Sequence, residues 1–159
     1  MSNSIKLWTI QNHQFLAQTL KHGRAIQTWE YVDEPFRLAY RWLTEQMAMR
    51  ELPTPGGAPP VWSWHSCGAF QHPPTEEDVE MFLGAPSRPE LDLVLIELLI
   101  DPKECLILRY GPWSDFLRDT VSKQRIDPTL AQEIFWDGSL PTTNWREQGN
   151  WFDLQAVLP

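Results

Sequence analysis

The chain has 159 residues, a length typical of one domain, and 42% of them are hydrophobic, enough to build a single core. Its 13 basic and 21 acidic residues give a formal net charge of -8, which disfavours bulk nucleic-acid binding and attachment to an anionic membrane. Two cysteines are too few for a disulfide scaffold, and neither a secretory signal nor a membrane span is recognisable, so we expect one cytoplasmic domain over residues 1–159.

The N-terminal part predicts a strand followed by a short helix. Residues 5–10 alternate with period two and are rich in β-forming side chains. Asn12 is a suitable N-cap for a helix over residues 13–21, and Gly23 can supply the left-handed residue that ends it.

A second helix begins near Asp33 and Pro35 and ends before Pro53. Its apolar side chains recur at helical spacing, at Phe36, Tyr40, Leu43 and Met47. A proline-rich loop follows, and residues 61–66 then predict a strand with both tryptophans on one face and Ser63 and His65 on the other.

The middle of the chain predicts one helix and two strands. Thr75 and Asp78 have the spacing of a capping box, at the start of a short helix that stops at Gly84. Residues 91–100 and 105–109 are expected to be strands, and the short turn between them favours an antiparallel hairpin.

The C-terminal part predicts a helix from Asp127 to Trp136 that ends at Gly138, a helical turn over residues 143–151 and a strand over residues 152–158. The whole pattern indicates an α+β fold, with a split, antiparallel-rich sheet and several short helices.

Standard catalytic signatures are absent from the sequence, which lacks GxxxxGK[ST], GxGxxG, HExxH, GxSxG and CxxC. His65, Cys67 and His72 are a cluster of metal-binding residue types, but their spacing matches no zinc pattern, and we expect a polar loop without a metal. Cys67 acting as a nucleophile with His65 as its base remains an alternative.

Nine tryptophans exceed what a small core needs. Trp8, Trp62 and Trp64 lie on predicted strands, so we expect some of these rings to line a pocket where a flat ring can stack. Ser63 and Gln11 would supply hydrogen bonds to the ligand. Ser63 and His65, on the face opposite the two tryptophans, would point toward that pocket or toward solvent.

Glu97 interrupts the most apolar strand of the chain. A carboxylate in this position is costly unless it is paired, exposed at an edge or kept for function. Glu97 is therefore either an outward-facing residue or a catalytic candidate.

Several segments, taken in order, resemble an uncharacterised bacterial family known as domain of unknown function 3841. They are Leu7-Trp8-Thr9-Ile10-Gln11, Ala39-Tyr40-Arg41-Trp42-Leu43, Pro60-Val61-Trp62-Ser63-Trp64 and the strand closed by Asp101-Pro102. More distantly, the layout is similar to ADP-ribosyltransferase-type folds, in which such elements build a nicotinamide-dinucleotide cleft.

This second resemblance implies an NAD-like dinucleotide ligand and a carboxylate that stabilises an oxocarbenium-like centre. Glu97, Glu147 and Asp153 are the catalytic candidates, and ADP-ribosyl transfer to an unknown target is the activity it implies. The rival hypothesis is a non-enzymatic interaction protein, from a mobile element or a toxin–antitoxin system, whose acidic surface binds a basic protein partner.

Overall fold

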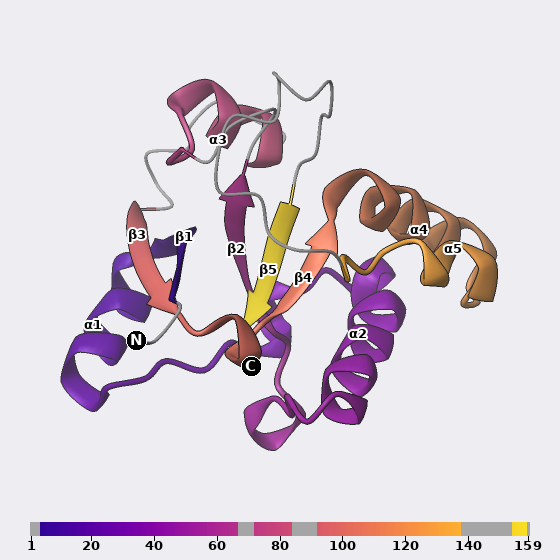
Figure 1. The fold of residues 1–159 in the computed structure, drawn as a ribbon, viewed down its shortest axis with the longest axis horizontal. Helices are drawn as coiled ribbons and strands as arrows, with labels where there is room; N and C mark the ends of the chain where they lie inside the picture. The colour runs from indigo at the N-terminus through magenta and orange to yellow at the C-terminus, as the bar shows by residue number, and fades with distance from the viewer. Residues whose placement is uncertain (1–3, 67–71, 84–91, 138–153, 159) are drawn as a thin grey trace.

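The computed structural model describes residues 4–66, 72–83, 92–137 and 154–158. Within them, five strands form one sheet in the order β3-β1-β2-β5-β4, and all of its pairings are antiparallel (Figure 1). The strands are β1 (Ile5–Asn12), β2 (Val61–Ser66), β3 (Leu93–Ile100), β4 (Leu106–Arg109) and β5 (Leu154–Leu158). The helices are α1 (His13–His22), α2 (Arg37–Met49), α3 (Glu76–Leu83), α4 (Tyr110–Lys123) and α5 (Pro128–Gln132). The expected α+β class is confirmed.

The sheet is split between β1 and β2. β1 pairs with β3 along its whole length, from Ile5 opposite Ile100 to Asn12 opposite Leu93, whereas its registered pairing with β2 is Trp8 opposite Trp64. Close by, the Thr9 hydroxyl donates a hydrogen bond to the Trp62 carbonyl at 2.7 Å. A side chain thus satisfies a backbone group that a continuous ladder would pair with backbone.

The helix starts follow the local capping signals. The Asn12 side chain accepts a hydrogen bond from the Phe15 amide at 2.8 Å, and Gly23, with φ of 72°, ends α1. At α3, the Asp78 carboxylate accepts from the Thr75 amide and the Thr75 hydroxyl accepts from the Asp78 amide. These caps satisfy donors that each helix start would otherwise leave unpaired.

The main core lies where α2 and α4 pack beside the β5–β4 side of the sheet (Figure 1). Leu43 is fully buried, as its helical spacing predicts, and its buried neighbours in this core are Ala39, Met47, Leu108, Trp113, Phe116, Ala131 and Ile134. No helix is predicted over α4 from the sequence pattern. Pro112 lies in the first turn of this helix, where a missing amide hydrogen costs nothing.

The predicted hairpin between β3 and β4 is wrong. These strands lie at opposite edges of the sheet, with three strands between them (Figure 1). The connection from Ile100 to Leu106 contains a short 3-10 helix, Pro102–Glu104, whose start is capped by the Asp101 side chain. It crosses the end of the sheet instead of reversing direction as a hairpin turn would.

The predicted helix from Asp127 to Trp136 is too long. The Asp127 carboxylate caps α5 as expected, but the helix ends at Gln132. The following residues run beside β4, where the Arg109 amide donates to the Ile134 carbonyl at 2.8 Å and the Trp136 amide donates to the Ile107 carbonyl at 3.0 Å. Backbone pairing to the sheet edge replaces helical pairing here.

The last predicted strand is present as β5, which lies between β2 and β4. Several other predictions fall outside the described residues, namely the helix stops at Gly84 and Gly138, the helical turn over residues 143–151, the reactive Cys67, and the catalytic candidates Glu147 and Asp153.

Candidate functional site

The tryptophans expected to stack on a ligand pack instead against other aromatic rings. The Trp62 ring lies 5.1 Å from the Trp113 ring and 6.0 Å from the Tyr40 ring, centroid to centroid. The Trp64 ring meets the Tyr110 ring edge to face at 5.3 Å. These distances are those of favourable aromatic pairs, so both rings contribute to the core.

Trp8 is buried, and Tyr40 is partly buried among other aromatic rings. Trp8 is opposite Trp64 in the sheet and is 4% exposed. Burial, with a smaller contribution from Asp33, raises the pKa of Tyr40 to about 12, although its contact with Trp62 acts in the opposite direction. The Tyr40 phenol therefore stays neutral at physiological pH and serves packing.

The predicted polar residues lie on the other face of β1 and β2. Gln27 donates to Gln11, and Gln11 donates to the Thr9 hydroxyl, each at 2.8 Å. Ser63 is fully buried, and its hydroxyl has no hydrogen-bond partner among the described residues. A buried hydroxyl without a hydrogen-bond partner is uncommon in proteins and lowers the stability of the fold. This face of β1 and β2 is therefore a buried polar surface.

His65 shares this buried face and is 2% exposed. Its Nδ1 lies 3.2 Å from the Ser66 hydroxyl, and burial lowers the pKa of the imidazole. Because side chains alternate along β2, the tryptophans lie on the opposite face from Ser63 and His65. The structure therefore does not bring the six predicted ligand-binding residues together around one ligand.

Glu97 lies on the exposed face of the edge strand β3. Its carboxylate is 3.1 Å from the Lys6 ammonium and accepts a hydrogen bond from the Trp8 indole at 3.3 Å. The Glu97 side chain is 52% exposed, so water screens this pair. Among the alternatives open for Glu97, the structure shows a paired residue at an exposed edge.

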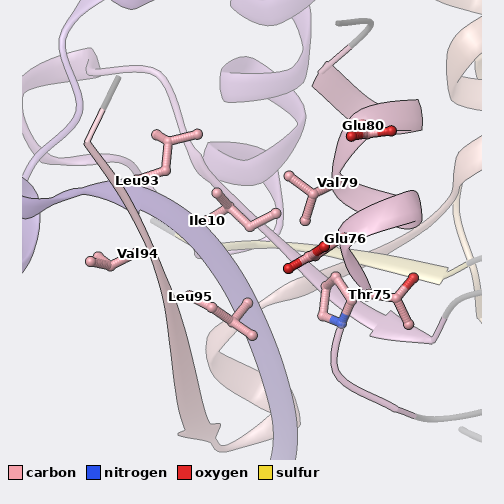
Figure 2. A pocket seen from close by; sticks show the side chains of 9 residues that line it. Ile10, Thr75, Glu76, Val79, Glu80, Leu93, Val94 and Leu95 are labelled. Atoms are coloured by element: carbon pink, nitrogen blue, oxygen red, sulfur yellow. The ribbon is translucent and has the colours of Figure 1, made fainter. Parts of the chain in front are cut away.

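A pocket of about 460 Å³ lies between α3 and the paired strands β1 and β3. In Figure 2, Ile10 from β1 and Val79 from α3 lie across from one another, with Leu93 and Leu95 on the strand side. The remaining lining residues are Pro74, Thr75, Glu76, Glu80 and Val94. This volume is within the range of small-molecule sites, and the walls combine aliphatic carbon with a few polar groups, as such sites usually do.

The charge of this pocket is negative. Glu76 and Glu80 lie on the α3 side, and neither forms an ion pair with a described residue (Figure 2). The capping pair of Thr75 and Asp78 already occupies the start of α3 and places another carboxylate there. The Glu76 and Glu80 side chains are both exposed, so water weakens their field, but its sign still favours a cation over a phosphate group in this pocket.

None of the candidate site residues that the structure describes lines this pocket. Its walls come from β1, β3 and α3, which are far apart in the chain and meet only in the folded sheet. The one local signal was the acidic first turn of α3, formed by Glu76, Glu77 and Asp78.

Within the described ranges, no group of three histidine, cysteine or acidic side chains is arranged to hold a metal ion. Cys105 is 6% exposed, and burial together with Asp101 and Glu104 raises the pKa of its thiol to about 11. Such a thiol is a poor nucleophile. No helix in the described part is long and apolar enough to cross a membrane.

Comparison with known families identifies the chain. The model of the family described as Domain of unknown function (DUF3841) matches residues 6–127. The chain belongs to this family. The matched region includes β1 from Lys6 onward, β2, β3, β4 and the pocket between α3 and the paired strands β1 and β3, here named the α3 pocket. It ends before α5 and β5. No curated protein and no solved structure matches the chain.

Proposed function

We propose that this DUF3841 protein binds an NAD-like dinucleotide and holds the positively charged nicotinamide nucleoside in the α3 pocket. The observation that carries this proposal is the combination of aliphatic walls with two carboxylates that have no ion pair in the described structure.

The chemistry of the oxidised nicotinamide ring matches this combination. The ring is flat, and its faces can pack against Ile10, Val79 and Leu95. Its positive charge is favoured beside the carboxylates of Glu76 and Glu80. Carboxylates also accept hydrogen bonds from ribose hydroxyls, as they do in other dinucleotide sites. The same carboxylates repel phosphate, so the diphosphate would extend out of the pocket.

ADP-ribosyl transfer is the reaction that such binding would allow. The bond between the ribose C1′ and the nicotinamide nitrogen breaks, and the nitrogen keeps the electron pair, so nicotinamide leaves as a neutral molecule. The ribose becomes oxocarbenium-like, and a carboxylate stabilises it until the acceptor attacks C1′ and loses a proton. Glu76 and Glu80 line the pocket, whereas Glu97 does not. Glu147 and Asp153 stay predictions.

The charge of the ring provides the test, because NAD⁺ and NADH differ mainly in whether the nicotinamide is cationic. We expect isothermal titration calorimetry to give about tenfold tighter binding of NAD⁺ than of NADH, a difference of about 1.4 kcal/mol. Glu80→Gln should remove most of this preference. Glu77→Gln is the matched control, since Glu77 is an exposed neighbour on α3 that does not line the pocket.

Equal affinity for the two ligands, or an equal loss in both variants, would contradict a cation site at Glu80. Absence of binding to either dinucleotide would refute the proposed function. It would favour the alternative, a non-enzymatic module whose acidic surface binds a basic protein. The edge strand β3 supports a protein partner in either case.

A further inference from the structure

We propose that the outer edge of β3 binds an extended, basic segment of a second protein as an additional strand. β3 is eight residues long and forms one edge of the sheet (Figure 1). Adding a strand to an open sheet edge is a common mode of peptide recognition, because the backbone groups of the edge are already aligned.

The two edges of the sheet differ in how they are covered. At the β4 edge, the backbone of residues 134–136 pairs with Ile107 and Arg109. At the β3 edge, the described residues provide no partner strand beyond β1. Proteins usually shorten, charge or cover such an edge, and a long uncovered edge is a ready template for another strand.

The side chains beside this edge are apolar. Leu95 is 49% exposed and Leu99 is 67% exposed, and both lie on the same face of β3 as Glu97. A partner strand would therefore place one apolar side chain beside each leucine and a basic side chain between them, beside Glu97.

The negative charge around the β3 edge favours a basic partner. Carboxylates occur at both ends and in the middle of the strand, at Asp92, Glu97 and Asp101, and Glu76 and Glu80 lie beside its N-terminal end at the pocket. Lys6 pairs with Glu97, and the His13 imidazole lies 2.8 Å from the Asp92 carboxylate. Asp101, Glu76 and Glu80 have no ion pair with a described residue, which leaves the edge acidic. A second copy of the chain would bring another -8 of formal charge to this surface. A basic segment from a different protein is therefore favoured over self-association.

A synthetic probe can test this inference without a nucleotide. The probe is a fluorescein-labelled peptide with threonine at every second position. The positions between the threonines carry leucine, lysine and leucine, in that order, and the control peptide carries glutamate in place of the lysine. We expect fluorescence anisotropy to show saturable binding of the lysine peptide and at least about tenfold weaker binding of the glutamate peptide.

Variants of the chain locate the binding. Leu99→Arg places a positive charge on the exposed face beside the edge and should weaken binding of the lysine peptide at least about tenfold. Met49→Arg is the matched control, because Met49 is 77% exposed on α2 and makes the same change of charge elsewhere. It should leave the affinity within about twofold, since it adds only a distant, screened charge. Circular dichroism verifies that both variants fold.

Three outcomes would overturn the inference. The first is no saturable binding of the lysine peptide to the native chain. The second is equal binding of the two peptides. The third is a dimer in sedimentation experiments that Leu99→Arg dissociates, which would assign the β3 edge to a second copy of the chain.

Discussion

Replacement of Leu43 by alanine tests the packing of α2 against the rest of the core. Leu43 is fully buried in the cluster that contains Leu108, Trp113 and Phe116. The substitution removes apolar groups whose transfer from water contributes roughly 2–2.5 kcal/mol. The unfilled space adds to this cost, so we expect a loss of about 3–4 kcal/mol in the free energy of unfolding. For a chain of this size, the corresponding decrease in Tm is roughly 10 °C.

Urea unfolding followed by tryptophan fluorescence measures this loss, because Trp42 and Trp113 are part of the same core. Leu20→Ala is the control, since Leu20 is 78% exposed on α1. Its effect should stay within about 0.5 kcal/mol. A similarly small effect of Leu43→Ala would refute the packing of α2.

Three further predictions concern Trp62, His65 and Cys105. Trp62→Ala should lower stability by about 3 kcal/mol, from the loss of its ring contacts, without a specific loss of NAD⁺ affinity in the folded protein, as urea unfolding and calorimetry would show. Since burial lowers the pKa of His65, the unfolded state binds the proton more readily, so stability should fall as the pH decreases below about 6.5, with a slope that His65→Gln reduces. In a Cys67→Ser variant, iodoacetamide should modify Cys105 roughly 100-fold more slowly at pH 8 than an exposed thiol, and mass spectrometry should show faster modification in urea.

Local signals in the sequence predict most of the elements and many of their ends. Asn12, Thr75 with Asp78, and Asp127 each cap the helix that their positions predict, because a cap depends only on residues within one turn. The burial of Leu43 follows from helical spacing in the same way. The two faces of β2 follow from alternation.

Features that depend on distant parts of the chain could not be predicted. The order of strands places β1, β2 and β5 between β3 and β4, which a short connection alone does not reveal. Alternation along β2 separates its two faces, but it does not reveal that both faces are buried, so the sequence alone favours a binding surface for its tryptophans. The α3 pocket has walls from three separated elements, and its aliphatic residues look like ordinary core residues in the sequence.

The position of a bound dinucleotide tests the central proposal most directly. We predict that a crystal structure of the chain with NAD⁺ shows the nicotinamide ring between Val79 of α3 and Ile10 and Leu95 of the paired strands, with the diphosphate directed away from Glu76 and Glu80. Nicotinamide density at another site, such as the face of Ser63 and His65, or an α3 pocket that stays empty at saturating NAD⁺, would contradict it.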